Sequence, residues 1–243
     1  HSLRDIHEKS AKKKLENLID SAMGQIKLYR NALKMTGKEM EEGFKEINEA
    51  IDSAEQRAGD MTETLRSEID AKALKFQEEI CQFKTIDISI SRPMLQGAVQ
   101  RHIMELKTFE FMKGMELAGQ INDIKNELSD KVNEVFGIEY KYSHDDINMS
   151  SIPNILTEKI EISGDDFETA KGVCTHLFEE VSKSVTIKLK EKIDGELSSA
   201  TDDLKDTLKT IFMFKEDDAF VVIRRIEDLN RLVRHLRSLR VKI

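Results

Sequence analysis

The sequence predicts an all-α protein, folded as an elongated antiparallel helical bundle or coiled coil. Along most of the 243 residues, apolar side chains recur at the three- and four-residue steps of a helix. Apolar residues make up 39% of the chain and charged residues 35%, with only two prolines. Long helices that bury one narrow seam need fewer apolar residues than a compact globule, so this composition favours an extended bundle.

The first 84 residues are predicted to form a long helical hairpin. The first helix has one apolar stripe, made of Leu15, Leu18, Ala22, Ile26, Tyr29 and Leu33. Gly37 is expected to stop this helix, and Thr36 with Glu39 to form the capping box of the next. The second helix has a heptad seam over residues 44–83, with a single stutter that locally unwinds a supercoil.

Residues 85–153 are predicted to contain an extended linker, a third helix and a loop. Ile86, Ile88 and Ile90 alternate with polar residues ahead of Pro93, which is typical of a short strand. Residues 159–163 repeat this pattern, so the two stretches are candidates for a tiny two-stranded ribbon at one end of the bundle. The third helix is expected over residues 95–136, with Gly137 ending it, followed by a loop over residues 138–153.

The middle of the third helix is apolar nearly all round. The residues that give it this character are Met104, Phe109, Phe111, Met112 and Met115. We expect this part of the helix to be buried on several sides. The alternative is an adaptable contact surface, because methionine side chains adjust their shape to a partner.

Residues 154–243 are predicted to form a long fourth helix and a short basic C-terminal helix. Residues 163–166 provide a helix cap with early acidic residues. From residue 167 to residue 211, apolar side chains recur at a mean spacing near 3.67 residues, and this seam is expected to face that of the second helix. The polar stretch 215–218 marks the break before the fifth helix. All three segments are expected to join one elongated bundle.

No catalytic, cofactor or metal site is predicted, and we therefore expect a protein that is not an enzyme. Gly37-Lys38 is the nearest approach to a phosphate loop, but it lacks the upstream glycine and the following Ser or Thr. None of the six histidines follows a glutamate by three residues, as di-metal bundles require. Cys81 and Cys174 lie on or beside apolar seams and are expected to be inert core thiols.

Composition also limits the location and the partners. No run of 18 apolar residues exists, so no membrane-spanning helix is predicted. Two distant cysteines in a chain rich in Lys and Glu favour a reducing cytoplasm, with a peripheral membrane location as the alternative. The chain has a net charge of −8 and no Trp, which disfavours nucleic acid as a partner.

The C-terminal helix is basic and amphipathic. Residues 221–243 carry a charge of +5, leaving −13 on the rest of the chain. One stripe holds Val222, Ile226, Leu229, Val233 and Leu236, and the opposite side holds Arg224, Arg231, Arg234 and Arg237. Such a helix can bind anionic lipid, nucleic acid or an acidic protein. We expect instead that it packs on the chain's own acidic body, with arginines reaching acids on neighbouring helices.

Long paired amphipathic helices, the Gly37 turn and the short basic final helix together resemble the stalk of a dynamin-like GTPase. That resemblance implies self-assembly through stalk surfaces and coupling to a membrane, with nucleotide chemistry in another domain. The chain shows no hydrophobic paddle. Helical pore-forming toxins share the layout of long helices, which gives a second resemblance. The sequence therefore predicts a non-enzymatic assembly or scaffold module, whose partner is a second copy or another helical protein.

Overall fold

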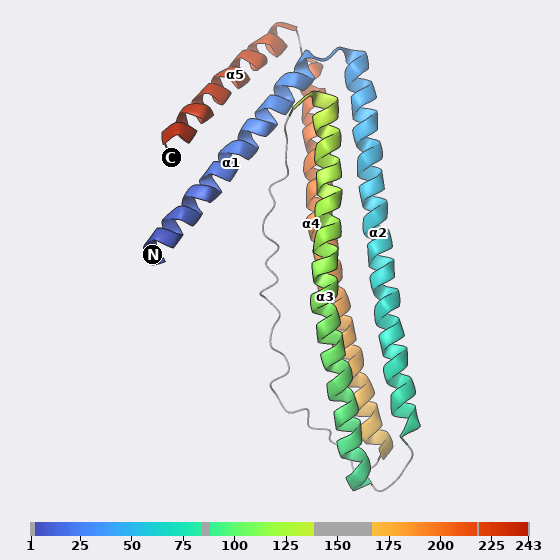
Figure 1. The fold of residues 1–243 in the computed structure, drawn as a ribbon. Coiled ribbons are helices and arrows are strands. Elements are labelled where there is room, and N and C mark those ends of the chain that lie inside the picture. Colours follow the sequence, from blue (N-terminus) through green and yellow to red (C-terminus); the bar gives the residue numbers. More distant parts are fainter. Residues whose placement is uncertain (1–2, 84–87, 139–166, 218, 243) are drawn as a thin grey trace. The chain divides into compact units, whose positions relative to one another are not determined.

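The structure is a computed structural model that describes residues 3–83, 88–138, 167–217 and 219–242. In these ranges the chain forms five helices (Figure 1). They are α1 (Leu3–Lys34), α2 (Gly37–Gln82), α3 (Ile88–Phe136), α4 (Phe167–Lys215) and α5 (Ala219–Lys242). The described residues include no strand, and the helices pack against one another. The prediction of an all-α helical bundle is confirmed.

The predicted ribbon is wrong at its first strand. Ile88 and Ile90 belong to α3, which also contains Pro93. An alternation over so few residues is a weak signal, and Pro93 removes one backbone hydrogen bond near the start of a 49-residue helix. The rest of that helix outweighs this local loss. Residues 159–163, the other expected strand, lie outside the described residues.

The described residues group into two compact units, and each is described by itself. Unit 1 takes its residues from 1–56, 122–145 and 197–243, and unit 2 from 57–121 and 146–196. Unit 1 therefore contains α1, α5, the first part of α2 and the last parts of α3 and α4. Unit 2 contains the remaining parts of α2, α3 and α4. The joining of residues 1–84, 85–153 and 154–243 into one elongated bundle stays a prediction.

In unit 1, α2 contacts α3 through apolar residues and an ion pair. An ion pair between Glu55 and Lys205 joins α2 to α4. Ile47 and Ile51 are fully buried. The Phe44 ring packs edge-on to Phe136, with 6.3 Å between centroids. Lys131 Nζ lies 2.9 Å from Glu46 Oε2, which links α3 to α2.

The apolar stripe predicted for the first helix is only partly right. Leu33 is buried, but Leu15 and Leu18 are 45% and 68% exposed, while Ile19 and Met23 are buried in their place. The two sets form adjoining stripes of the same helix, and a 3.6-residue period fits either one. Which stripe is covered depends on the neighbouring helices.

The turn between α1 and α2 contains the predicted capping box. Thr36 Oγ1 accepts a hydrogen bond from the Glu39 backbone N–H (3.3 Å), and the Thr36 N–H donates to Glu39 Oε2 (2.8 Å). The bonds that the Thr36 N–H and the Thr36 hydroxyl donate to the Glu39 carboxylate lower its pKa. Gly37 is the first residue of α2 and does not stop α1, so that detail was wrong. Lys215 Nζ instead donates to the Leu33 carbonyl at the end of α1 (3.0 Å).

The end of α3 lies where the sequence placed it. Gly137 has a φ of 60°, a conformation that favours glycine, and the Ile138 N–H donates to the Asn133 carbonyl (3.3 Å). Asn31 Nδ2 of α1 donates to the Phe136 carbonyl (2.9 Å). Both bonds satisfy carbonyls that a helix end leaves without a partner.

Unit 2 has a core of aromatic and aliphatic side chains from α2, α3 and α4. Phe76 of α2 stacks on Phe178 of α4 with 4.2 Å between ring centroids. Around them lie Ile80, Leu95, Val99, Ile103, Leu106, Phe167, Ala170 and Cys174. Nearly all seam positions predicted for the second and fourth helices are buried or partly buried. Burial of large aromatic side chains is a main source of the stability of such a core.

Candidate interaction surfaces

The middle of α3 exposes most of the apolar residues that were expected to be buried. Met104 is 58% exposed, Met112 61%, Met115 54% and Phe111 44%. Only Phe109 is partly covered, and Lys72 Nζ of α2 lies over its ring at 4.8 Å from the centroid. The expectation of burial on several sides is therefore wrong for four of these five residues.

The opposite face of α3 shows why these side chains point outward. That face is buried and carries Ile103, Leu106 and Leu117, each at most 1% exposed. It also buries Glu110 and Lys113. A half-turn rotation of α3 would cover the methionines, but it would expose these aliphatic residues and separate the buried charges from their partners.

Those buried charges are paired in unit 2. Lys113 Nζ donates to Glu68 Oε1 of α2 (3.0 Å) and to Glu116 Oε1 (3.1 Å). Burial opposes the charge on Lys113, but the hydrogen bonds to both carboxylates outweigh it, and the pKa of Lys113 is raised. Lys188 Nζ of α4 lies 3.7 Å from Glu110 Oε1. These contacts fix the rotation of α3 about its own axis.

Five uncharged positions on the outer side of α3 are spaced like a coiled-coil seam. Met104, Thr108, Phe111, Met115 and Ala118 follow one another at steps of four, three, four and three residues. We call these five positions the α3 seam. None of them carries a charge, and the first four are exposed. A solvent-facing heptad line without charges is typical of a helix that pairs with another helix.

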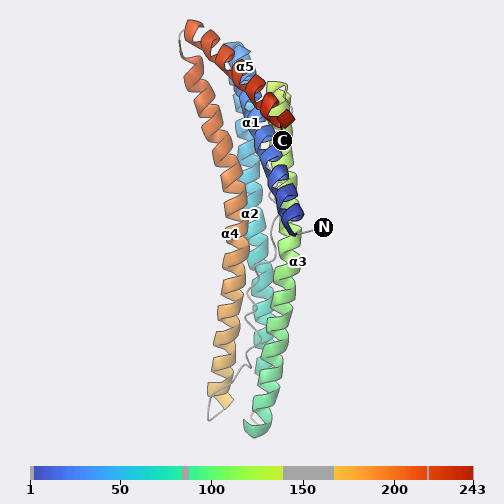
Figure 2. The same ribbon diagram turned by 90° about the vertical axis from the view of Figure 1, so that its left-hand side faces the viewer.

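The C-terminal helix α5 packs on α1 in the antiparallel direction, and the two helices lie side by side in both views (Figures 1 and 2). Arg240 Nη1 reaches Asp20 Oδ1 (2.8 Å), and Arg30 Nη1 donates to Asn230 Oδ1 (3.4 Å). The predicted stripe is the covered side of α5, with Val233 buried and its other members partly buried. The expected packing on the chain's own body is thus observed for the apolar stripe.

The four predicted arginines of α5 do not reach acids on neighbouring helices. Arg224, Arg231, Arg234 and Arg237 are all exposed. Arg231 Nη1 lies 3.4 Å from Asp228 Oδ1 of its own helix, and Arg234 Nε donates to the Asn230 carbonyl. Within the described ranges, Arg224 and Arg237 form no ion pair. This side of α5 is therefore a cationic surface open to solvent.

Exposed apolar residues at the start of α5 were missed by the sequence reading. Phe220 is 72% exposed and Ile223 57%. Helical spacing places both on the side of Arg224 and Arg231 rather than in the covered stripe. The apolar run over residues 219–223 was the available signal, but a run of that kind does not say which of its members face solvent.

The start of α5 is held in place by Arg225. Its Nη2 lies 2.7 Å from Asp217 Oδ2 in the turn after α4. The guanidinium also lies over the Phe214 ring of α4, 4.0 Å from the centroid, and Phe214 in turn packs on Tyr29 of α1. This basic residue therefore has an internal structural role that its exposed neighbours lack.

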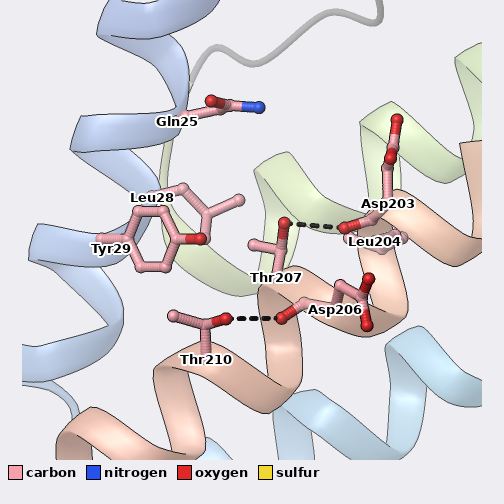
Figure 3. Close-up of a pocket in the computed structure, with 8 residues that line it drawn as sticks. All are labelled: Gln25, Leu28, Tyr29, Asp203, Leu204, Asp206, Thr207 and Thr210. Atoms are coloured by element: carbon pink, nitrogen blue, oxygen red, sulfur yellow. Dashed lines mark hydrogen bonds between the residues drawn. The ribbon is translucent and has the colours of Figure 1, made fainter.

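A hollow of about 280 Å³ lies between α1 and α4 in unit 1. Figure 3 shows the residues that line it. Gln25, Leu28 and Tyr29 line it from α1, and Asp203 and Asp206 are among the α4 residues. The hydroxyls of Thr207 and Thr210 donate to carbonyls of their own helix (both 2.8 Å). Because these hydroxyls are already used, the polar groups that remain in the lining are the Gln25 amide and the carboxylates of Asp203 and Asp206. The wall of this hollow is therefore acidic.

A second hollow of unit 1, of about 510 Å³, lies between α2 and α4. Met40, Phe44 and Phe212 supply its apolar side chains. Glu41, Glu49 and Asp52 make its polar lining acidic, and Lys45 is the only cation among its lining residues. Lys45 Nζ lies 3.8 Å from Glu49 Oε1. We call it the acidic hollow.

Three titratable residues of unit 2, Glu79, Arg101 and His102, form a cluster that holds α2 to α3. His102, which is 2% exposed, lies edge-on to Phe76, and its Nε2 is 2.7 Å from Glu79 Oε2. Arg101 also bonds Glu79. The hydrogen bond from His102 lowers the pKa of Glu79. No group of three or more His, Cys, Asp or Glu side chains in the described part of the chain is arranged to hold a metal ion.

The two cysteines differ. Cys174 is fully buried, as predicted, and burial raises the pKa of its thiol to about 11. Cys81 is exposed, so the expectation of an inert core thiol was wrong there. It lies one residue past the buried Ile80, and that single step turns it to the solvent side of α2.

Among the described residues, no helix is long and apolar enough to cross a membrane. No protein-family model matches the chain, and no curated protein or solved structure is significantly similar to it.

Proposed function

We propose that this chain is a non-enzymatic helical assembly module, and that the α3 seam pairs with the same seam of a second copy. The observation that carries the proposal is the exposure of Met104, Phe111 and Met115 at heptad spacing with no charge between them on that line. A contiguous exposed apolar surface is a mark of an interaction site. A second copy presents the same seam, so a two-fold axis would place one apolar seam against the other.

The size of the seam sets the strength of the contact. Each of these side chains is about half exposed, so covering the remainder contributes roughly 1 kcal/mol per side chain. Ordering the flexible methionines and joining two molecules opposes that gain. We therefore expect weak association that depends on concentration. The resemblance to dynamin-like stalks, which act through self-assembly, agrees with this role.

The seam is tested by sedimentation velocity over a range of protein concentrations. The wild-type chain is expected to sediment faster as its concentration rises. The double variant Met104→Lys, Met115→Lys should associate at least tenfold more weakly over the same range, because the charges buried in the contact would lack partners. Both positions are exposed, so the variant should keep its circular dichroism spectrum and its unfolding midpoint.

Leu74→Lys is the matched control. Leu74 of α2 is 58% exposed, like Met104, and it lies in the same unit but not on the seam. This variant should associate as the wild type does. A seam variant that associates as strongly as the Leu74 variant would contradict the proposal.

A further inference from the structure

We propose a second contact between copies, in which the basic face at the start of α5 of one molecule occupies the acidic hollow of another. This inference rests on the proposed self-association and names a surface pair distinct from the α3 seam. Both surfaces belong to unit 1 of the same chain. Their chemistries are opposite in charge and alike in carrying exposed aromatic side chains.

The α5 side of the contact combines charge with apolar area. Phe220 and Ile223 are exposed, and Arg224, Arg231 and Arg234 continue the same side of the helix toward its C-terminal end. Glu227 also lies on this side and Asp228 pairs with Arg231, so the three arginines leave it with a charge of +1. The arrangement provides an apolar group to fill a hollow and cations to meet its rim.

The acidic hollow offers the matching features. Phe212, which is 47% exposed, lines it together with Met40 and Phe44. Glu41, Glu49 and Asp52, offset only by Lys45, give its lining a charge of −2. Aromatic rings favour contact with other rings and with guanidinium groups, and Phe220 and Arg224 would supply both.

The contact has to be between molecules because α5 is already anchored. Its apolar stripe packs on α1, and Arg225 and Arg240 hold it to Asp217 and Asp20. The basic face is on the other side of the helix, and its arginines are exposed among the described residues. An anionic lipid surface would also attract the arginines, but it would leave the acidic hollow without a role.

Charge reversal tests the pairing. The reversals are made in the Met104→Lys, Met115→Lys chain, in which the α3 seam is disabled, and also in the wild type, which keeps the seam. In the seam-disabled chain, Arg231→Glu with Arg234→Glu in the basic face should weaken the remaining association at least tenfold. In the hollow, Glu49→Lys with Asp52→Lys should weaken it to the same extent. Both pairs are exposed and lie within helices, so the fold should persist.

Combining both pairs of reversals in one Met104→Lys, Met115→Lys chain should restore association to within about threefold of the same chain without reversals, because the charges again match with opposite sign. Association of the chain without reversals should fall as salt is raised from 50 to 500 mM. Asp60→Lys with Glu63→Lys is the control: it makes the same charge change on exposed positions of α2 away from the hollow, and it should leave association unchanged.

Three other outcomes of these experiments would each contradict one part of the two proposals. Reversal of the arginines without loss of association overturns the second contact and leaves the α3 seam standing. A seam variant that associates as strongly as the wild type, and loses this only on charge reversal, overturns the seam and supports the second contact. Vesicles containing 30% phosphatidylserine provide the last arm: arginine-dependent vesicle binding, with self-association unaffected, would assign the basic face to a membrane instead.

Discussion

At the scale of single residues, the two thiols have opposite environments. Cys174 is enclosed in the unit 2 core, close to Phe76 and Phe178, and its thiol pKa of about 11 keeps it protonated at neutral pH. Cys81 is exposed on α2. Because the thiolate is the reactive form and must be reached by the reagent, the two cysteines should react at very different rates.

We expect one thiol per chain to react rapidly with a maleimide or aromatic disulfide reagent at pH 7. Cys81→Ser should remove this fast reaction, and Cys174→Ser should leave it in place. In 6 M guanidinium chloride both thiols of the wild-type chain should react. Rapid modification of two thiols in the folded chain would show that the unit 2 core is open. The readout is absorbance or the mass of the intact protein.

The Glu79 carboxylate gives a pH dependence at the same scale. Its pKa is lowered in the folded chain, first by the hydrogen bond with His102. A group whose folded pKa is depressed contributes stability that is present above its unfolded pKa, and this stability is lost as the pH falls through the folded pKa. The loss therefore lies below the ordinary Glu value of 4.5.

Glu79→Gln should lower the free energy of unfolding by about 1 kcal/mol at pH 7, since the carboxylate is partly screened by solvent. The difference from the wild type should begin to shrink as the pH falls below the ordinary Glu value of 4.5, because the carboxyl of the unfolded chain then binds protons before that of the folded chain. Urea unfolding at several pH values measures it. Glu78→Gln, at the exposed neighbouring position, should have little effect at any pH. A difference that persists unchanged at pH 3 would contradict the role given to this charge.

At the scale of elements, the approach of α2 to α3 in unit 1 depends on Gly43. A Cβ atom added at Gly43 would lie 2.5 Å from Val135 Cγ1, a distance that forces the helices or the valine to move. Valine is stiff about its first side-chain bond, so it cannot turn away cheaply. At Gly59, in the same helix, an added Cβ would meet nothing within 4 Å.

Gly59→Ala should stabilise the chain by roughly 0.5–1 kcal/mol, the helix propensity difference between the two residues. Gly43→Ala gains the same propensity but has to push against Val135, so it should be destabilising by about 1–2 kcal/mol relative to Gly59→Ala. Adding Val135→Ala to the Gly43 variant should recover part of that loss. Chemical unfolding of the four chains measures these effects. Equal stabilisation at both glycines would show that the helices are further apart.

The ends of the helices could be predicted from the sequence wherever a capping residue, a glycine or an apolar seam marks them. The capping box at Thr36 and Glu39, the glycine end of α3 and the seams of the second and fourth helices were all predicted. Each depends on residues within one helix or turn. The strand at Ile88 was wrong because three alternating residues cannot outweigh the helix that continues after them.

At the scale of the whole molecule, the two proposed contacts between copies depend on how charge and apolar surface are distributed. The chain is acidic overall, at −8, while α5 is basic and keeps four arginines in solvent. Unit 2 exposes the α3 seam, and unit 1 exposes the basic face and the acidic hollow. Two different surface pairs on one chain are enough to extend an assembly beyond a dimer, provided that the contacts do not close on themselves.

The candidate surfaces were only partly predictable from sequence. Met104, Phe111 and Met115 of the seam and the arginines of the basic helix were singled out, but the former were expected to be buried and the latter paired. Thr108 and Ala118 of the seam were not singled out. Phe220, Ile223 and the acidic hollow were not foreseen. The hollow combines residues of α2 with Phe212 of α4, which are far apart in the chain, and no local pattern joins them.

The amino-acid sequence alone determined that this chain forms helices, where most of them begin and end, and which stripe of the second and fourth is apolar. Those properties depend on backbone caps and on the helical repeat, which act over a few residues. Only the tertiary structure decided which of two adjoining apolar stripes on α1 and α3 faces solvent. Packing selects the stripe that places the aliphatic residues and the paired charges together, and that choice depends on helices distant in the chain.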